Sequence, residues 1–154
     1  MFSNKIVKTI LTFLGISFGI GMASAQDLQP VQWHVAATKI SDNTYEVKYT
    51  ATIDPHWYLY AQDISEGGPI PTHFELDTPN AHFTETIQEE GAVIEKYDDL
   101  FGIIIKKYAT EVVFVAKIES NKVLKSISTN VEFMSCDDSR CLPPEVINLT
   151  TKVE

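Results

Sequence analysis

The chain has 154 residues, of which 44% are hydrophobic and 21% charged, and its formal net charge is −9. This composition is typical of one globular domain and excludes a disordered or collagen-like chain. The acidic balance also argues against nucleic acid as a partner, because phosphate binding needs a surplus of lysine and arginine.

The first segment, Met1 to Gln26, is typical of a secretory signal peptide. It has lysines near its start, an apolar run over residues 10–20 and the small-x-small cleavage signal Ala23-Ser24-Ala25. The apolar run is shorter than the roughly 20 residues that span a bilayer, which favours cleavage over an uncleaved anchor. We therefore expect residues 1–25 to be a signal peptide and residues 26–154 to be one periplasmic or secreted domain, without membrane insertion after cleavage.

The rest of the sequence alternates with the period of β-strands. Over residues 44–53, polar residues interleave with an apolar series, which is Tyr45, Val47, Tyr49, Ala51 and Ile53. Other strands are expected around Val31–Val35 and over Trp57–Tyr60, Thr72–Leu76, Phe83–Ile87, Val93–Tyr97, Ile103–Tyr108, Val112–Ile118, Ile127–Met134 and Val146–Val153. Because no stretch keeps a helical period, the sequence predicts an all-β fold, an immunoglobulin-like antiparallel β-sandwich.

The two cysteines are the strongest candidates for chemistry. A strand runs into Cys136, four polar turn residues follow, and two prolines after Cys141 stop regular pairing. A Cys136–Cys141 disulfide would close the tip of a hairpin. A cross-link that closes a loop of this length stabilises the fold by only about 2 kcal/mol. A structural staple and a redox-active pair are therefore both open from the spacing alone.

Neighbouring charges distinguish the two sulfurs. Asp137 and Asp138 follow Cys136 and disfavour its thiolate, whereas Arg140 precedes Cys141 and favours its thiolate. We therefore predict that Cys141 is the sulfur that exchanges with a partner.

Three segments resemble one family. The run FMSCDDSRCLPPEV, residues 133–146, resembles the active-site hairpin of the N-terminal periplasmic domain of the thiol:disulfide interchange protein DsbD. His56–Tyr60 resembles the aromatic strand whose tyrosines line that cysteine site, and Asp98–Gly102 resembles its cap loop. The segments occur in the order of the family, so the resemblance covers essentially all of the predicted mature chain.

The resemblance implies an immunoglobulin-like domain that acts as a thiol:disulfide oxidoreductase, a protein-disulfide reductase. It would relay electrons from a thioredoxin-like or membrane donor to oxidised periplasmic acceptor proteins, with Cys136 and Cys141 as the redox pair and Cys141 in the mixed disulfide. The residues that would line or cap the site are Tyr58, Tyr60, Asp98, Asp99, Leu100 and Phe101. No metal or organic cofactor is implied.

This sequence differs from the best-known members of the family in two respects. Its loop between the cysteines is one residue shorter, and Leu100 stands where the first cap residue is usually aromatic. Full-length members continue into a membrane domain and a thioredoxin-like domain, whereas this sequence stops at Glu154, so we expect a stand-alone domain whose donor comes in trans.

A second class of function is a non-catalytic secreted β-sandwich binding domain with a structural disulfide. The reduction potential of the disulfide and its accessibility to a small thiol would separate the two classes. The four histidines are scattered without the spacing of metal ligands, so no metal site is predicted.

Overall fold

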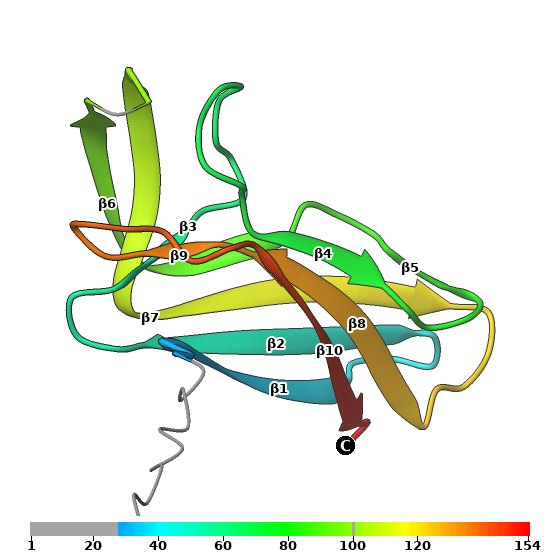
Figure 1. The fold of residues 1–154 in the computed structure, drawn as a ribbon. Helices are drawn as coiled ribbons and strands as arrows, with labels where there is room; N and C mark the ends of the chain where they lie inside the picture. Colours follow the sequence, from blue (N-terminus) through cyan, green and yellow to red (C-terminus); the bar gives the residue numbers. More distant parts are fainter. Residues whose placement is uncertain (1–27, 100) are drawn as a thin grey trace, which may run out of the picture.

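The strands of the protein follow the alternating segments of the sequence, because each buries one apolar face. The computed structural model describes residues 28–99 and 101–154, and within these ranges ten strands form two sheets (Figure 1). The strands are β1 Val31–Lys39, β2 Thr44–Ile53, β3 Tyr58–Tyr60, β4 His73–Leu76, β5 Ala81–Phe83, β6 Gln88–Asp98, β7 Ile103–Ser120, β8 Ser126–Phe133, β9 Ser135–Cys136 and β10 Glu145–Lys152. The predicted signal peptide, residues 1–25, lies outside the described residues.

The long strand β7 organises the larger sheet, whose order is β1-β2-β7-β3-β9, with β5 and β6 also paired to β7. The smaller sheet has the order β10-β8-β4. A parallel bridge between Ala37 and Val153 joins edges of the two sheets. The sheets pack as two layers (Figure 1), as the predicted sandwich requires. In the part of the chain that is described, no helix has the length and apolar character to cross a membrane.

The core lies between the two sheets. The apolar series predicted for β2 is buried, with Tyr45, Val47, Tyr49 and Ala51 fully inaccessible and Ile53 4% exposed. Phe114 of β7 packs against Trp33 of β1 and Phe74 of β4, with ring centroids 5.9 and 5.0 Å apart. The Tyr49 hydroxyl lies 2.7 Å from Thr129 Oγ1 of β8, so one hydrogen bond crosses the sandwich.

Two expectations about strand boundaries were wrong. The segments predicted as separate strands, Ile103–Tyr108 and Val112–Ile118, form the single strand β7. Thr110 has a φ of 70°, in the left-handed region, so the strand turns between its halves without ending. The predicted strand Phe83–Ile87 also fails, because β5 ends at Phe83. Ile87 still reaches the core and is 9% exposed, which explains why its apolar character suggested a strand.

The bend in β7 separates a hairpin arm from the body of the sandwich. We call the outer halves of the two strands, Val93–Asp98 and Ile103–Tyr108, the β6–β7 arm. A register shift between Gly91 and Val93 in β6 lies near the bend at Thr110. The arm rises from one end of the molecule, beside the hairpin that begins with β9 (Figure 1).

Candidate functional site

The two cysteines form a disulfide at the tip of a hairpin, as the spacing predicted. Cys136 and Cys141 lie opposite each other as an antiparallel bridge, with their Cα atoms 4.0 Å apart. The N–H of Leu142 donates to the carbonyl oxygen of Ser135 at 2.9 Å. Backbone pairing therefore closes the hairpin independently of the disulfide.

Asp137 organises the turn between the cysteines. Its Oδ1 accepts hydrogen bonds from the N–H groups of Ser139 and Arg140, at 2.7 and 2.8 Å. Its Oδ2 lies 3.5 Å from Arg140 Nε. The hydrogen bond from the Ser139 N–H is the main cause that lowers the pKa of the Asp137 carboxyl, and Arg140 lowers it further. From the sequence, Asp137 was expected to act on Cys136 and Arg140 on Cys141. In the structure the two charges pair with each other.

Exposure distinguishes the two sulfur-bearing residues. Cys136 is only 3% exposed, whereas Cys141 is an exposed residue. Access to a sulfur is one determinant of which end of a disulfide a thiolate attacks. Cys141 is therefore the more accessible residue of the pair.

Strand register gathers side chains beside Cys136 on one face of the larger sheet. Tyr58 pairs with Cys136, and Tyr60, two residues on, pairs with Lys107 of β7. Directly paired residues share a face of a sheet, and so do residues two apart along a strand. The same face continues along the arm through the pairs Ile105–Lys96 and Ile103–Asp98.

These side chains border a groove between the arm and the cysteine hairpin. The groove has a volume of about 590 Å³. Its lining mixes acidic, basic and apolar groups with both cysteines, and comprises Tyr60, Lys96, Tyr97, Asp98, Asp99, Phe101, Ile105, Lys107, Cys136, Asp137, Asp138, Ser139, Arg140 and Cys141. Six of the eight predicted site residues thus line one groove: Tyr60, Asp98, Asp99, Phe101, Cys136 and Cys141.

In the sequence, Tyr60 is 38 positions from Asp98 and 81 positions from Cys141. The short strand β3 brings these distant segments together, because it pairs with β7 on one side and with β9 on the other.

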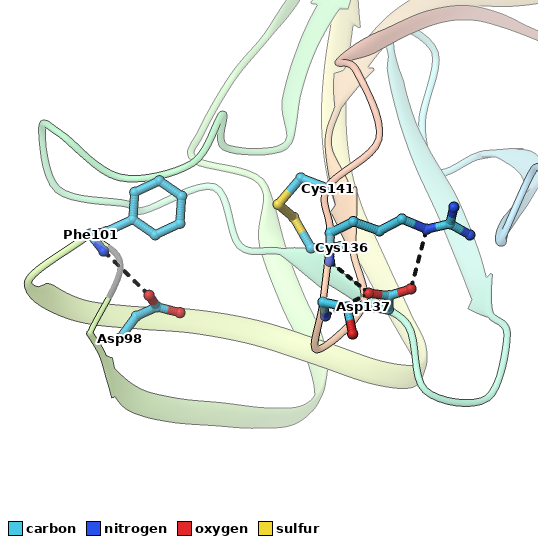
Figure 2. The surroundings of a disulfide bond; sticks show 7 residues. Asp98, Phe101, Cys136, Asp137 and Cys141 are labelled. Atoms are coloured by element: carbon cyan, nitrogen blue, oxygen red, sulfur yellow. Dashed lines mark hydrogen bonds and ion pairs between the residues drawn. A yellow bond between two sulfur atoms is a disulfide. The ribbon is translucent and has the colours of Figure 1, made fainter.

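Phe101 lies at the end of the arm and lines the groove. Its ring points from the end of the arm toward the disulfide (Figure 2), and it packs against the small buried cluster of Tyr60, Ile105 and Cys136. The N–H of Phe101 donates to Asp98 Oδ1 at 3.3 Å, and the N–H of Gly102 donates to the Asp98 carbonyl oxygen at 2.8 Å. These two hydrogen bonds fix the backbone of the turn at Phe101. Leu100, the other predicted cap residue, lies outside the described residues.

The remaining predicted site residues have different surroundings. Asp99 is exposed and lines the groove. Tyr60 also lines it but is only 4% exposed, and burial, followed by the negative charge of Asp98, raises its pKa to about 12. Tyr58 is half-buried and is not among the lining residues. Its ring instead carries the ammonium of Lys107, with Nζ 3.7 Å from the ring centroid.

Four lining residues of the arm were not predicted as site residues from the sequence: Lys96, Tyr97, Ile105 and Lys107. All four lie in segments that were predicted only as strands. Their membership of the site depends on the pairing of β7 with β3 and β6, for which the sequence carries no local signal. Within the described ranges, no group of three or more His, Cys, Asp or Glu residues is arranged to hold a metal ion.

Comparisons with known proteins give a family and a fold. A protein-family model described as "Thiol:disulfide interchange protein DsbD, N-terminal" matches residues 25–152. A comparison with curated proteins finds no match.

Among solved structures, the chain is similar to the N-terminal periplasmic domain of ScsB from Proteus mirabilis, with a TM-score of 0.59, 18% identity, and coverage of 80% of this chain and 47% of that one. It is similar to the reduced N-terminal domain of DsbD from Neisseria meningitidis, with a TM-score of 0.53, 17% identity, and coverage of 80% and 85%. A third match is the complex between the DsbD and PilB N-terminal domains from Neisseria meningitidis, with a TM-score of 0.51, 18% identity, and coverage of 82% and 88%.

The chain therefore spans about half of the ScsB chain and most of the two DsbD domains. The three likenesses confirm the predicted fold class, an all-β, immunoglobulin-like antiparallel sandwich. The family model covers most of the sequence, including both cysteines and the arm. The chain belongs to the family of the N-terminal domain of the thiol:disulfide interchange protein DsbD.

Proposed function

We propose that the domain exchanges electrons with partner proteins through a reversible Cys136–Cys141 disulfide. The observation that carries the proposal is the asymmetry of the pair, in which the exposed Cys141 is bonded to the buried Cys136 at the edge of a groove. Of the two residues, Cys141 is the more accessible to a partner thiolate, while the burial of Cys136 keeps competing thiols away. The hairpin also has a backbone hydrogen bond of its own, from the Leu142 N–H to the Ser135 carbonyl oxygen, so we expect it to stay closed when the disulfide is open.

In the reducing direction, the Cys141 thiolate attacks the disulfide of an oxidised acceptor. One acceptor sulfur leaves as a thiolate, and a mixed disulfide forms through Cys141. The Cys136 thiolate then attacks Cys141 Sγ, which restores the internal disulfide and releases the acceptor as a dithiol. A donor dithiol reverses these steps on this domain, so two electrons pass from donor to acceptor in each cycle.

The partners in this proposal are a thioredoxin-like or membrane donor supplied in trans and oxidised acceptor proteins of the periplasm. Family membership supports the exchange chemistry. The existence of a complex between the DsbD and PilB N-terminal domains of Neisseria meningitidis supports protein partners for this chain. The reduced form known for a Neisseria meningitidis domain supports a disulfide that opens without loss of the fold. The proposed location in the periplasm rests on the predicted signal peptide and on the periplasmic ScsB domain.

Trapping of a mixed disulfide tests the proposal. Reduced Cys136→Ser and Cys141→Ser variants are incubated separately with a thioredoxin-like protein that lacks its second active-site cysteine and carries the first as a mixed disulfide with a small thiol, which leaves on exchange, and the products are analysed on non-reducing gels. Cys136→Ser should accumulate a stable adduct, because the resolving thiol is missing, and Cys141→Ser should give none. Adducts with Cys141→Ser alone would reverse the roles of the two sulfurs. No adduct with either variant would favour the binding domain with a structural disulfide.

A further inference from the structure

The buried sulfur of Cys136 must carry a negative charge when the disulfide opens. When a partner thiolate bonds to Cys141, the Sγ–Sγ electron pair leaves with Cys136, which is 3% exposed and lies in a cluster with Tyr60 and Ile105. A thiolate in apolar surroundings is unfavourable unless a positive charge or hydrogen bonds compensate it. A leaving sulfur with a lower pKa also departs faster. The rate of exchange therefore depends on which cation lies near Cys136.

Three cations line the groove, and their surroundings differ. Arg140 is engaged with Asp137, at 3.5 Å. Lys96 is exposed on β6, which is separated from β9 by two intervening strands. Lys107 lies on β7, one strand nearer, and its Nζ is 3.7 Å from the centroid of the Tyr58 ring. Within residues 28–99 and 101–154, neither lysine forms an ion pair.

Tyr58 connects Lys107 to the buried sulfur. Tyr58 is the residue paired with Cys136 between β3 and β9, and Lys107 is paired with the next residue on that face of β3, Tyr60. A cation over an aromatic ring is attracted by the negative face of the ring. The ring of Tyr58 thus holds the ammonium on the face of the sheet that carries Cys136.

We propose that Lys107, held by Tyr58, is a positioning residue that stabilises the thiolate of Cys136 during disulfide exchange. The proposal rests on the exchange function proposed above and names the cation that stabilises the leaving thiolate. The partner thiolate forms the new S–S bond to Cys141, the internal S–S bond breaks, and Cys136 takes the electron pair beside the ammonium. The ammonium keeps its proton throughout.

The other charged groups of the groove make this contribution measurable. Four carboxylates line it, from the arm and from the cysteine hairpin, and they oppose a thiolate: Asp98, Asp99, Asp137 and Asp138. The phenol of Tyr60 is neutral at physiological pH, since its pKa is about 12. Removal of Lys107 leaves this acidic surplus less compensated, so the Cys136 thiol should become harder to ionise.

The direct test measures the thiol pKa of Cys136 in a Cys141→Ser background, where it is the sole thiol, from the pH dependence of its ¹³Cβ chemical shift. Lys107→Met should raise this pKa by about 0.5–1 unit, and Lys107→Arg should restore most of the change. Lys106→Met is the matched control. It removes the same charge from the adjacent position, where the side chain faces the other side of the sheet and bonds Asp63 at 3.2 Å. An equal shift in Lys106→Met, or none in Lys107→Met, would overturn the proposal.

A second measurement tests the role of the ring. In the protein with both cysteines, Lys107→Met should slow reduction of the disulfide by a small thiol about two- to fivefold. Tyr58→Leu should slow it in the same direction, and the double variant should be no slower than Lys107→Met alone, because both changes act through one ammonium. Additive effects would contradict this coupling.

The two proposals fail in different ways. Shifted pKa and rate values without any trapped partner would leave Lys107 in its role and overturn the exchange function. A trapped partner with unshifted values would overturn the role of Lys107 alone.

Discussion

The body of the sandwich and its groove end are built differently. In the body, long strands from two sheets bury a continuous aromatic core, with Phe114 and Tyr49 fully inaccessible. At the groove end, β3 has three residues and β9 has two, and the separate buried cluster consists of Tyr60, Ile105 and Cys136. Most of the buried apolar surface is therefore remote from the cysteines. A domain arranged in this way can change the state of its disulfide while its core holds the fold.

The largest effect on stability should come from the body. Phe114→Ala removes a fully buried ring that packs against Trp33, Phe74 and Tyr108. We expect the free energy of unfolding to fall by about 3–5 kcal/mol, measured by urea denaturation. Val113→Ala, at the adjacent and only half-buried position, is the control and should cost much less. Equal losses would show that burial in the core is not what distinguishes the body.

The next largest effect should be a loss of stability at alkaline pH, caused by a residue of the body. Burial raises the pKa of Tyr49 from 10.0 to about 12, opposed by its hydrogen bond with Thr129. The folded state thus retains the phenol proton that the unfolded chain releases from about pH 10. This contribution is fully present below pH 10 and is lost as the pH rises toward 12, by about 2–3 kcal/mol in total.

Denaturation at several pH values between 9 and 12 measures this loss. Tyr49→Phe should be less stable at neutral pH by about 1 kcal/mol, because Thr129 loses its partner, but should decline less steeply above pH 10. The control is Tyr97→Phe on the arm, where the side chain is 56% exposed; it should keep the steep decline. A wild-type slope in Tyr49→Phe would place the alkaline loss elsewhere.

The same two regions differ in how far the sequence predicts them. The series from Tyr45 to Ile53 predicted a buried face correctly, because alternation is a local pattern that maps directly onto a strand. The hairpin between Cys136 and Cys141 was also predictable, because a turn depends on neighbouring residues. The groove was only partly predictable. Lys107 enters it through the register between β3 and β7, which joins residues far apart in the chain.

Backbone geometry explains why the single strand β7 was predicted as two strands. The strand β7 bends at Thr110 without ending, and the bend turns the arm toward the cysteine hairpin. A threonine in the left-handed region is uncommon, so the sequence carries no signal for a bend that leaves the strand unbroken. The sequence therefore predicted two separate strands. In the structure they are the two halves of β7, and their continuity places the arm beside the disulfide.

Reduction of the disulfide should cost less than either change in the body. A six-residue loop contributes about 2 kcal/mol through the unfolded state. We expect the reduced protein to keep its β-sheet circular dichroism and a cooperative melt, shifted to lower temperature. The Cys136→Ala, Cys141→Ala double variant should behave like the reduced protein. Loss of cooperative unfolding in both samples would instead make the disulfide a structural staple.

The smallest effect on stability, and the most informative about the groove end, is expected for Phe101→Ala. Phe101 is half-buried, and its ring points toward the disulfide and packs against the small cluster rather than the main core. Removal of the ring should cost about 1 kcal/mol or less, well below the loss expected for a core phenylalanine. It should also raise the rate of attack by a small thiol about threefold or more, because access to the sulfur limits exchange.

Thiol kinetics and denaturation on the same variant separate the two roles that Phe101 can have. Ile104→Ala is the control, since this residue is on the same arm, is 57% exposed and is not among the groove-lining residues; it should change neither quantity. If Phe101→Ala reacts at the wild-type rate but loses about 2 kcal/mol or more, Phe101 is an ordinary packing residue. A faster reaction with little loss of stability would mean that the arm shields the disulfide without contributing much to the fold, so a partner can displace Phe101 while the body stays intact.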